Sequence, residues 1–107
     1  MTFWIDTHCH LDATEFEPDA PLVRARAAMN NVAHCLLPAV GVENFEAVRA
    51  MAYINRDSYA LGIHPLYVKR ALDEDLMVLE QQLQLHQNDP RLVAVGEIGI
   101  DLFEPEW

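Results

Sequence analysis

Phe3-Trp4-Ile5-Asp6-Thr7-His8-Cys9-His10-Leu11-Asp12 is an apolar run followed by two closely spaced histidines. The run is typical of a short buried strand, which we expect to cover residues 3–7. In an extended backbone, residues i and i+2 face the same side, so His8 and His10 present two imidazoles together. Neutral imidazole is a common ligand of divalent transition metals, and the pattern therefore indicates a metal site. The alternative is a pair of polar residues in the turn after the strand.

Two more ligand-type residues follow strand-like runs further along the chain. The apolar run 92–95 leads into Gly96-Glu97, and the run 58–61 leads into Gly62-Ile63-His64-Pro65. A carboxylate at the end of a buried strand is costly unless it is paired or bound to a metal, which makes Glu97 a candidate ligand. Pro65 restricts His64 to an extended backbone. The alternatives are a Glu97 that accepts backbone N–H groups or lies in solvent, and a purely structural His64.

The chain alternates strand-like and helical segments. We expect strands at 3–7, 34–39, 59–63 and 92–97, with three helices between them, the first capped by Asp19 and the third covering 73–86. The apolar positions expected to pack the helices are Leu22, Ala25, Met29 and Val32, then Phe45, Val48 and Met51, then Leu76, Leu79 and Leu83. Near-continuous apolar strands separated by helices indicate an α/β fold with a parallel sheet. Right-handed crossovers predict the strand order 1-2-3-4, with the helices on the outer face.

All the candidate ligands follow the carboxyl ends of expected strands. In barrel enzymes this face carries the active site. The placement therefore supports a metal site independently of any single motif. We expect His8, His10 and Glu97 to converge at one end of the sheet.

Three segments together resemble the successive signatures of the TatD family of metal-dependent hydrolases, in order and in spacing. They are Asp6-Thr7-His8-Cys9-His10-Leu11-Asp12, Gly62-Ile63-His64-Pro65 and Gly96-Glu97-Ile98-Gly99-Ile100-Asp101. The resemblance runs through nearly the whole chain. It implies a TIM-type (β/α)₈ barrel with one or two divalent metals at the carboxyl ends of its strands. It also implies deoxyribonuclease or phosphoesterase activity.

The resemblance assigns roles to four residues of this chain. It implies that His8 and His10 ligate one metal, that Glu97 ligates that metal or bridges two, and that His64 binds substrate near its phosphate. Mixed imidazole and carboxylate ligands fit Zn²⁺ or Mn²⁺, and Mg²⁺ less well because it prefers oxygen, although the family is commonly called magnesium-dependent. The family's later strands bring two more histidines and a catalytic aspartate, which we expect to lie beyond Trp107.

Length sets the expected domain organisation. A (β/α)₈ barrel needs about 250 residues, and this chain has 107. We therefore expect residues 1–107 to form one incomplete barrel domain, the N-terminal part of a TatD-type barrel. Four parallel strands that do not close leave the first and fourth with unpaired edges, which predicts possible self-association.

Composition indicates the cellular compartment that we expect for the protein. No run approaches the roughly 20 apolar residues of a membrane span, and no signal peptide is visible, so we expect a cytoplasmic protein without a membrane partner. Cys9 and Cys35 are too few for a disulfide framework, and Cys9 is interpreted as a small core residue. His34 and His86 are interpreted as ordinary surface or boundary residues.

The net charge of −10 argues against broad electrostatic capture of nucleic acid, which depends on Lys and Arg. It does not exclude a nuclease, because bound metal ions supply local positive charge. There is no Gly-rich phosphate loop of the ATP- or NAD-binding kind. A phosphate-bearing substrate must therefore be held mainly at the metal site.

Three hypotheses follow from the sequence. The leading one is a metal-dependent hydrolase that cleaves phosphodiester bonds, with DNA as the expected partner and 3′–5′ exonuclease-like action, by metal-activated water. The second is a truncated, catalytically incompetent portion of such an enzyme that serves as a metal-binding or oligomerising module. The third is another member of the wider metal-dependent amide and phosphotriester hydrolases, against which the segment 96–101 favours TatD. We expect the 107 residues alone to bind one ion weakly and to turn over little substrate.

Overall fold

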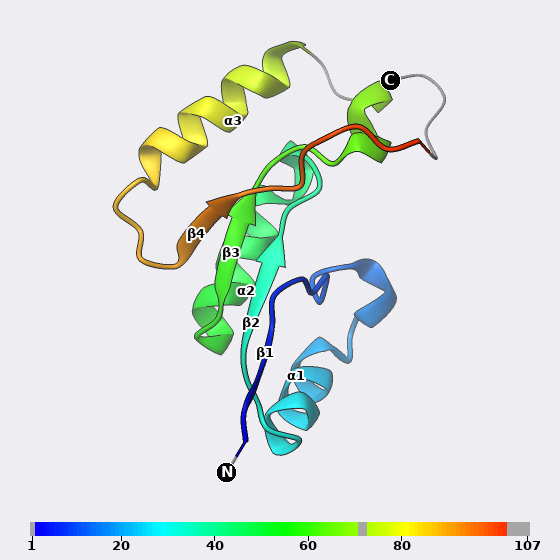
Figure 1. The fold of residues 1–107 in the computed structure, drawn as a ribbon, viewed down its shortest axis with the longest axis vertical. Coiled ribbons are helices and arrows are strands. Elements are labelled where there is room, and N and C mark those ends of the chain that lie inside the picture. Colours follow the sequence, from blue (N-terminus) through cyan, green and yellow to red (C-terminus); the bar gives the residue numbers. More distant parts are fainter. Residues whose placement is uncertain (1, 71–72, 103–107) are drawn as a thin grey trace.

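The computed structural model, which describes residues 2–70 and 73–102, is a parallel sheet covered by helices (Figure 1). The strands are β1 (Trp4–Asp6), β2 (Val32–Pro38), β3 (Ser58–Leu61) and β4 (Leu92–Val95). The helices are α1 (Ala20–Met29), α2 (Phe45–Asn55) and α3 (Asp73–Leu85), with 3₁₀ turns η1 (Thr14–Phe16), η2 (Val42–Asn44) and η3 (Pro65–Arg70).

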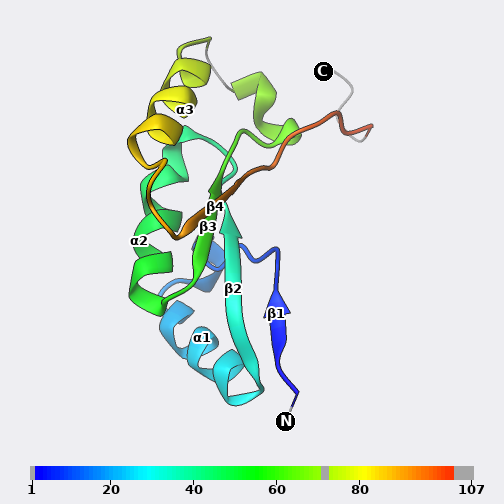
Figure 2. The ribbon, with the colours of Figure 1, turned by 60° about the vertical axis from the view of Figure 1, so that its left-hand side comes forward.

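The sheet has the strand order β1-β2-β3-β4, and every neighbouring pair is parallel. Figure 2 shows the three α-helices on the same side of this sheet, while its other side is bare. Both the strand order and the single helical layer confirm the architecture predicted from the alternating pattern. The carboxyl ends of all four strands consequently point to one end of the molecule, as in part of a β/α barrel.

The hydrophobic core lies between the central strands and α2. Leu37 on β2, Val48 on α2 and Tyr59 on β3 are fully buried, and the smaller Ala52 lies among them. The expected apolar stripe of α2 is therefore confirmed for Phe45 and Val48, which are buried in this core. Burying a large apolar side chain contributes about 1.5–3 kcal/mol, so this layer dominates the stability of the sheet.

The stripe predicted for the first helix is wrong. Leu22 and Met29 are 66% and 83% exposed, and Val32 belongs to β2 rather than to the helix. The buried side chains of α1 are Ala20 and Arg24. Arg24 is buried because it forms two short hydrogen bonds to the fully buried Asp57, Nε to Oδ2 at 2.7 Å and Nη2 to Oδ1 at 2.8 Å.

The third helix and the strand bounds follow the sequence more closely. In α3, Leu79 and Leu83 pack against the core as expected, whereas Leu76 is 64% exposed. The four strands lie within two residues of their predicted bounds. Asp19 does occupy the cap position of α1, but its side chain makes no capping hydrogen bond.

The sheet face opposite the helices, together with both edge strands, exposes large apolar side chains. On β1 and just before it, Phe3, Trp4 and Ile5 are 64–66% exposed. On β4, Val93 and Val95 are 51% and 53% exposed. Such an apolar surface normally marks a contact with other protein. Among the residues described, no helix has the length and apolar character needed to cross a membrane.

Candidate metal centre

The ligand-type residues lie just beyond the carboxyl ends of three strands. His8 and His10 follow β1, His64 follows β3 and Glu97 follows β4. Although β1 and β4 are the two edges of the sheet, the side chains of His8, His10 and Glu97 meet, with their ligand atoms all within 4.8 Å of one another. The curvature of the sheet brings the two edges together, as the sequence predicts.

The contacts within the cluster are short. His8 Nε2 lies 3.0 Å from His10 Nε2 and 2.5 Å from Glu97 Oε1. His10 Nε2 lies 3.2 Å from the same Oε1. On the other side of the carboxylate, His64 Nε2 lies 3.1 Å from Glu97 Oε2. Two imidazole nitrogens and one carboxylate oxygen therefore converge on one small space.

The Glu97 carboxylate is buried but poorly satisfied. Its side chain is 7% exposed, and neither oxygen has a hydrogen-bond partner of acceptable geometry in the part of the chain that the structure describes. A buried carboxylate in this state is costly. A divalent cation shared with the two histidines would satisfy it, and imidazole plus carboxylate is a ligand set that zinc and manganese accept. The residues present therefore fit the expected metal.

His64 has a fixed tautomer. Its Nδ1 accepts the backbone N–H of Leu66 at 3.0 Å, so the proton of the neutral ring is on Nε2. The backbone N–H of His64 donates to the carbonyl of Val40 at 2.8 Å. The ring is therefore oriented by its own loop and the backbone of His64 by the loop after β2, with Nε2 3.1 Å from Glu97 Oε2.

Backbone hydrogen bonds hold the other candidate ligands in place. The N–H of Cys9, between the two histidines, donates to the carbonyl of Leu36 on β2 at 3.0 Å, and the N–H of Gly96 donates to the carbonyl of Leu61 on β3 at 3.0 Å. The N–H of His8 donates to Asp6 Oδ1 at 3.1 Å. Backbone hydrogen bonds to β2 and β3 therefore continue the sheet into the segments that carry these candidate ligands.

Gly62 allows β3 and the end of β4 to approach closely. A Cβ at this position would lie 1.6 Å from the carbonyl oxygen of Gly96 and 2.9 Å from the backbone nitrogen of Glu97. Only glycine fits here, because the obstacle is backbone rather than a movable side chain. The close contact sets the distance of Glu97 from β3 and from His64.

The sequence does not reveal a second polar network beside the histidines. Asn44 Nδ2 donates to Asp12 Oδ2 at 2.9 Å, and Asn44 Oδ1 accepts the N–H groups of Val40 and Gly41 at 2.9 and 3.2 Å. Asn44 thereby ties the loop after β1, which carries His10, to the loop after β2. An asparagine before an apolar helix resembles an ordinary cap, so the only available signal was the position of Asp12 two residues after His10.

The two cysteines are not part of the cluster. Cys9 packs against the core and Cys35 is buried within it. Burial and the nearby Asp6 raise the pKa of the Cys9 thiol, while burial and Asp57 raise that of Cys35 to about 11. Both thiols are therefore held protonated at neutral pH, consistent with the interpretation of Cys9 as a core residue. His34 bonds to Ser58 through Nε2 at 2.7 Å, away from the cluster.

A parallel α/β sheet with imidazole and carboxylate ligands at the carboxyl ends of its strands is typical of metal-dependent hydrolases built on the β/α barrel. Comparison with known proteins agrees. Residues 5–106 match the family model described as TatD related DNase. The chain belongs to the TatD-related family.

Similar proteins are named metal-dependent hydrolases. The uncharacterized metal-dependent hydrolase YjjV of Escherichia coli K12 is 42% identical over 101 residues, which cover 94% of this chain and 38% of YjjV. An uncharacterized metal-dependent hydrolase of Haemophilus influenzae is 33% identical over 107 residues, covering 96% of this chain and 40% of the relative.

The fold comparison gives the same relationship. The crystal structure of YjjV, a TatD homologue, superposes with a TM-score of 0.86 at 40% identity, over 95% of this chain and 39% of the YjjV chain. The fold described above is therefore a partial barrel of the TatD type. The chain spans about two-fifths of the length of the relatives that it matches.

Proposed function

We propose that this chain supplies the first ligands of a metal-dependent phosphodiesterase that acts on DNA. The observation that carries the proposal is the buried Glu97 carboxylate. Its oxygens make no hydrogen bond of acceptable geometry with the residues that the structure describes, while His8 and His10 face it at 2.5 and 3.2 Å. The family description as a DNase and the names of the relatives as metal-dependent hydrolases support it. In this proposal residues 1–107 are one incomplete barrel domain.

His8, His10 and Glu97 would hold one divalent ion, which is Zn²⁺, Mn²⁺ or Mg²⁺. Three protein ligands are typical of a catalytic site, because they leave a coordination position open. A divalent ion held there supplies Lewis acidity, which lowers the pKa of coordinated water and polarises a phosphoryl oxygen. Glu97 Oε2 faces away from His8 and His10 toward His64, so the same carboxylate could also reach a second ion.

His64 would bind the substrate phosphate. Its Nδ1 is occupied by the N–H of Leu66, so its Nε2–H is a dedicated donor beside the ligands. A hydrogen bond from this group to a phosphate oxygen would orient the ester and balance part of its charge. The aspartate that activates water is proposed to lie in the part of the barrel that this chain does not span. The protein is proposed to act in the cytoplasm.

The test is a metal-supplemented assay with DNA and with a generic phosphodiester. The purified 107-residue chain is expected to show little turnover, because it spans only about two-fifths of the length of its relatives. A longer chain, in which the remaining part of the E. coli relative follows the fourth strand, is expected to hydrolyse the phosphodiester. His8→Ala in that chain should lower kcat/KM by at least about 100-fold, beyond the loss typical of groups that only support a ligand. Turnover that survives His8→Ala would contradict the assigned role of this residue.

A second candidate is a metal-binding module that associates with itself. The exposure of Trp4 on one edge strand and of Val93 on the other favours it. In this case the 107-residue chain binds metal and forms oligomers, and the longer chain hydrolyses no phosphodiester.

A further inference from the structure

A cleft lies directly beside the metal cluster, between the loops that follow β1, β2 and β3. It has a volume of about 420 Å³, within the range of roughly 300–1,000 Å³ of small-molecule sites. His10 and His64, which both contact Glu97, form part of its wall. A group bound in the cleft would therefore lie beside a phosphate bound at the cluster.

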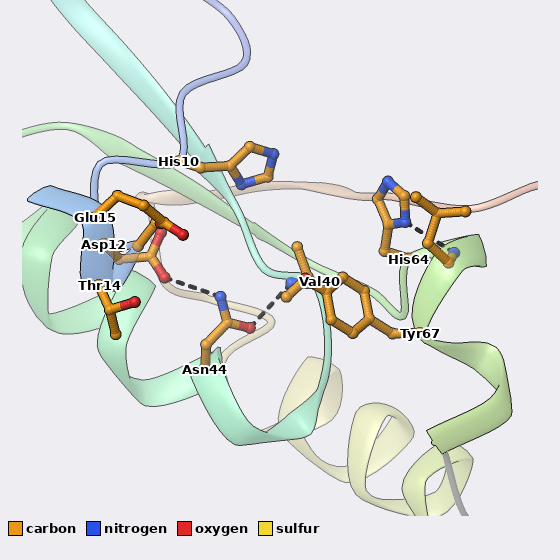
Figure 3. Close-up of a pocket in the computed structure, with 10 residues that line it drawn as sticks. His10, Asp12, Thr14, Glu15, Val40, Asn44, His64 and Tyr67 are labelled. Atoms are coloured by element: carbon orange, nitrogen blue, oxygen red, sulfur yellow. Dashed lines mark hydrogen bonds between the residues drawn. The ribbon is translucent and has the colours of Figure 1, made fainter. Parts of the chain in front are cut away.

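Figure 3 shows how the side chains surround this cleft. Asp12, Thr14 and Glu15 lie on one side, from the loop after β1 and η1, and His64 and Tyr67 lie on the other. Asn44 holds the floor through its bond to Asp12, at 2.9 Å. The same hydrogen bonds that join the loops after β1 and β2 therefore also hold the wall of the cleft.

The lining chemistry excludes a second phosphate as the occupant. Among the described residues around the cleft, none is a lysine or arginine, whereas Asp12 and Glu15 are carboxylates. Anions bind where cationic side chains or free backbone N–H groups gather. Carboxylate and hydroxyl oxygens instead accept hydrogen bonds from hydroxyl or amino groups. The occupant is therefore a group that carries hydrogen-bond donors rather than an anion.

We propose that this cleft binds the organic group of the phosphoester substrate and recognises its hydrogen-bond donors through Glu15 and Thr14. This inference rests on the proposed function, because it takes the phosphate to lie at the cluster. The sugar of the 3′-terminal nucleotide is the occupant that we favour, since its free 3′-hydroxyl lies within a few bonds of the adjoining phosphorus. An amino group on a base is the other source of the same chemistry.

Direct binding to the Mn²⁺-loaded protein separates these sources. The probes are methyl phosphate, deoxyribose 5-phosphate, and the 5′-monophosphates of thymidine and deoxyadenosine, measured by calorimetry. Two net hydrogen bonds of about 1 kcal/mol each correspond to a gain of roughly tenfold or more. Deoxyribose 5-phosphate is therefore expected to bind at least tenfold more tightly than methyl phosphate. An advantage seen only with deoxyadenosine monophosphate would assign the donor to the base amino group.

Variants locate the effect in the cleft. Glu15→Gln and Thr14→Val should each remove most of the advantage over methyl phosphate, while methyl phosphate itself still binds. The matched control is Glu46→Gln, on the outer surface of α2 with its side chain 75% exposed, which should keep the full advantage. Thermal unfolding of each variant verifies that it folds.

Three results would overturn the inference. Equal binding of methyl phosphate and of every sugar-bearing probe would show that the cleft recognises nothing, while leaving the proposed function intact. Tighter binding of pyrophosphate than of deoxyribose 5-phosphate would show that the cleft accepts an anion. Failure of all phosphates to bind would overturn the proposed function together with this inference.

Discussion

Asn44 connects the loop after β1, which carries His10, to the loop after β2, and its side-chain amide uses both of its ends to do so. Its oxygen accepts two backbone N–H groups, from Val40 and Gly41, and its nitrogen donates to Asp12. The backbone of Val40 in turn accepts the N–H of His64. Single residues of this kind do not touch a metal, but they decide where the ligands lie.

Asn44→Asp is expected to weaken metal binding by about 10–100-fold, the range for residues that orient metal ligands. The substitution keeps the oxygen that accepts from Val40 and Gly41 but places a second carboxylate against Asp12. The variant should also lose about 1–3 kcal/mol of unfolding free energy, because a part-buried hydrogen bond becomes a repulsion. Calorimetric titration with Mn²⁺ and urea unfolding measure the two effects.

Asn30→Asp is the matched control for that change. Asn30 is exposed at the end of α1, and its amide donates to the carbonyl of Arg26, so Asn30→Asp also replaces a donor by a carboxylate oxygen but should leave the metal affinity unchanged. A purely structural role for Asn44 would lower stability but leave the metal affinity of the folded variant unchanged.

The sequence predicts His8, His10 and Glu97 as a group because each follows an apolar run that has to be a strand. Their convergence in the structure agrees with that prediction, and their role as ligands remains to be tested. The sequence does not predict the structural roles of Asn44 and Gly62. Their importance depends on what lies opposite them in space, Asp12 in one case and the Gly96 backbone in the other.

Among the secondary-structure elements, the junction of β3 and β4 sets the position of Glu97. Gly62→Ala would bring a methyl group 1.6 Å from the carbonyl oxygen of Gly96 and must displace the end of β4. Inserting an atom into a packed site costs about 1–3 kcal/mol or more, and here the obstacle is backbone, so we expect at least the upper figure. Metal affinity should fall by tenfold or more, measured by Mn²⁺ titration.

Gly96→Ala provides the control across the same junction. A Cβ on Gly96 meets no atom within 4 Å, so this variant should keep nearly full stability and metal affinity. If Gly62→Ala and Gly96→Ala behaved alike, the close approach would not be what positions Glu97.

The loop between α3 and β4 is held by Asp89. Its carboxylate accepts from the hydroxyls of Tyr53 and Tyr59 at 2.5 and 2.6 Å and from the N–H of Arg91 at 2.9 Å. Burial alone would raise the pKa of Asp89, but these hydrogen bonds and the Arg49 charge hold that pKa below its ordinary value. The charged carboxylate therefore stabilises the fold.

Asp89→Asn is expected to destabilise the protein at pH 7 by about 1–3 kcal/mol, the cost of losing hydrogen bonds to a charged group. Because the pKa is lowered on folding, the contribution is fully present above the ordinary aspartate pKa of about 3.9 and is lost as pH falls through the folded-state value. Urea unfolding between pH 7 and pH 2.5 should show the difference between wild type and variant shrinking below about pH 4. A difference that stays constant over this range would contradict the role of the charge.

Helix α1 shows why the elements could be predicted better than their orientation. The pattern of Leu22 and Met29 indicates a helix, which exists, but predicts the wrong face. The buried face carries Arg24, which hydropathy assigns to solvent. Its partner Asp57 lies 33 residues away in sequence, and only the folded sheet brings the two together.

For the whole molecule, the bare face and the two edges of the sheet are the main feature. We expect the isolated 107-residue chain to associate, because apolar side chains and unpaired strand edges are both exposed. Light scattering after size exclusion should give a mass above that of the 12.2 kDa monomer. Trp4→Lys and Val93→Lys, one on each edge strand, should shift the mass toward the monomer.

Met29→Lys is the control for these variants, since Met29 is 83% exposed on α1, in the helical layer. It should leave the mass unchanged. A wild-type chain that stays monomeric at high concentration would rule out self-association. The sequence predicts these unpaired edges, because four parallel strands are too few to close a barrel. It does not predict which surface packs against them.

Calorimetric titration of the purified chain with Zn²⁺ or Mn²⁺ tests the metal site most directly. Binding of one ion per chain is expected, with His10→Ala and Glu97→Gln each weakening it by at least about 100-fold, more than is typical of residues that only orient ligands. His86→Ala, which changes a histidine that follows α3 at the other end of β4, should leave the affinity unchanged. Binding that persists in both His10→Ala and Glu97→Gln, or that is lost in His86→Ala, would contradict the assignment of the metal to this cluster.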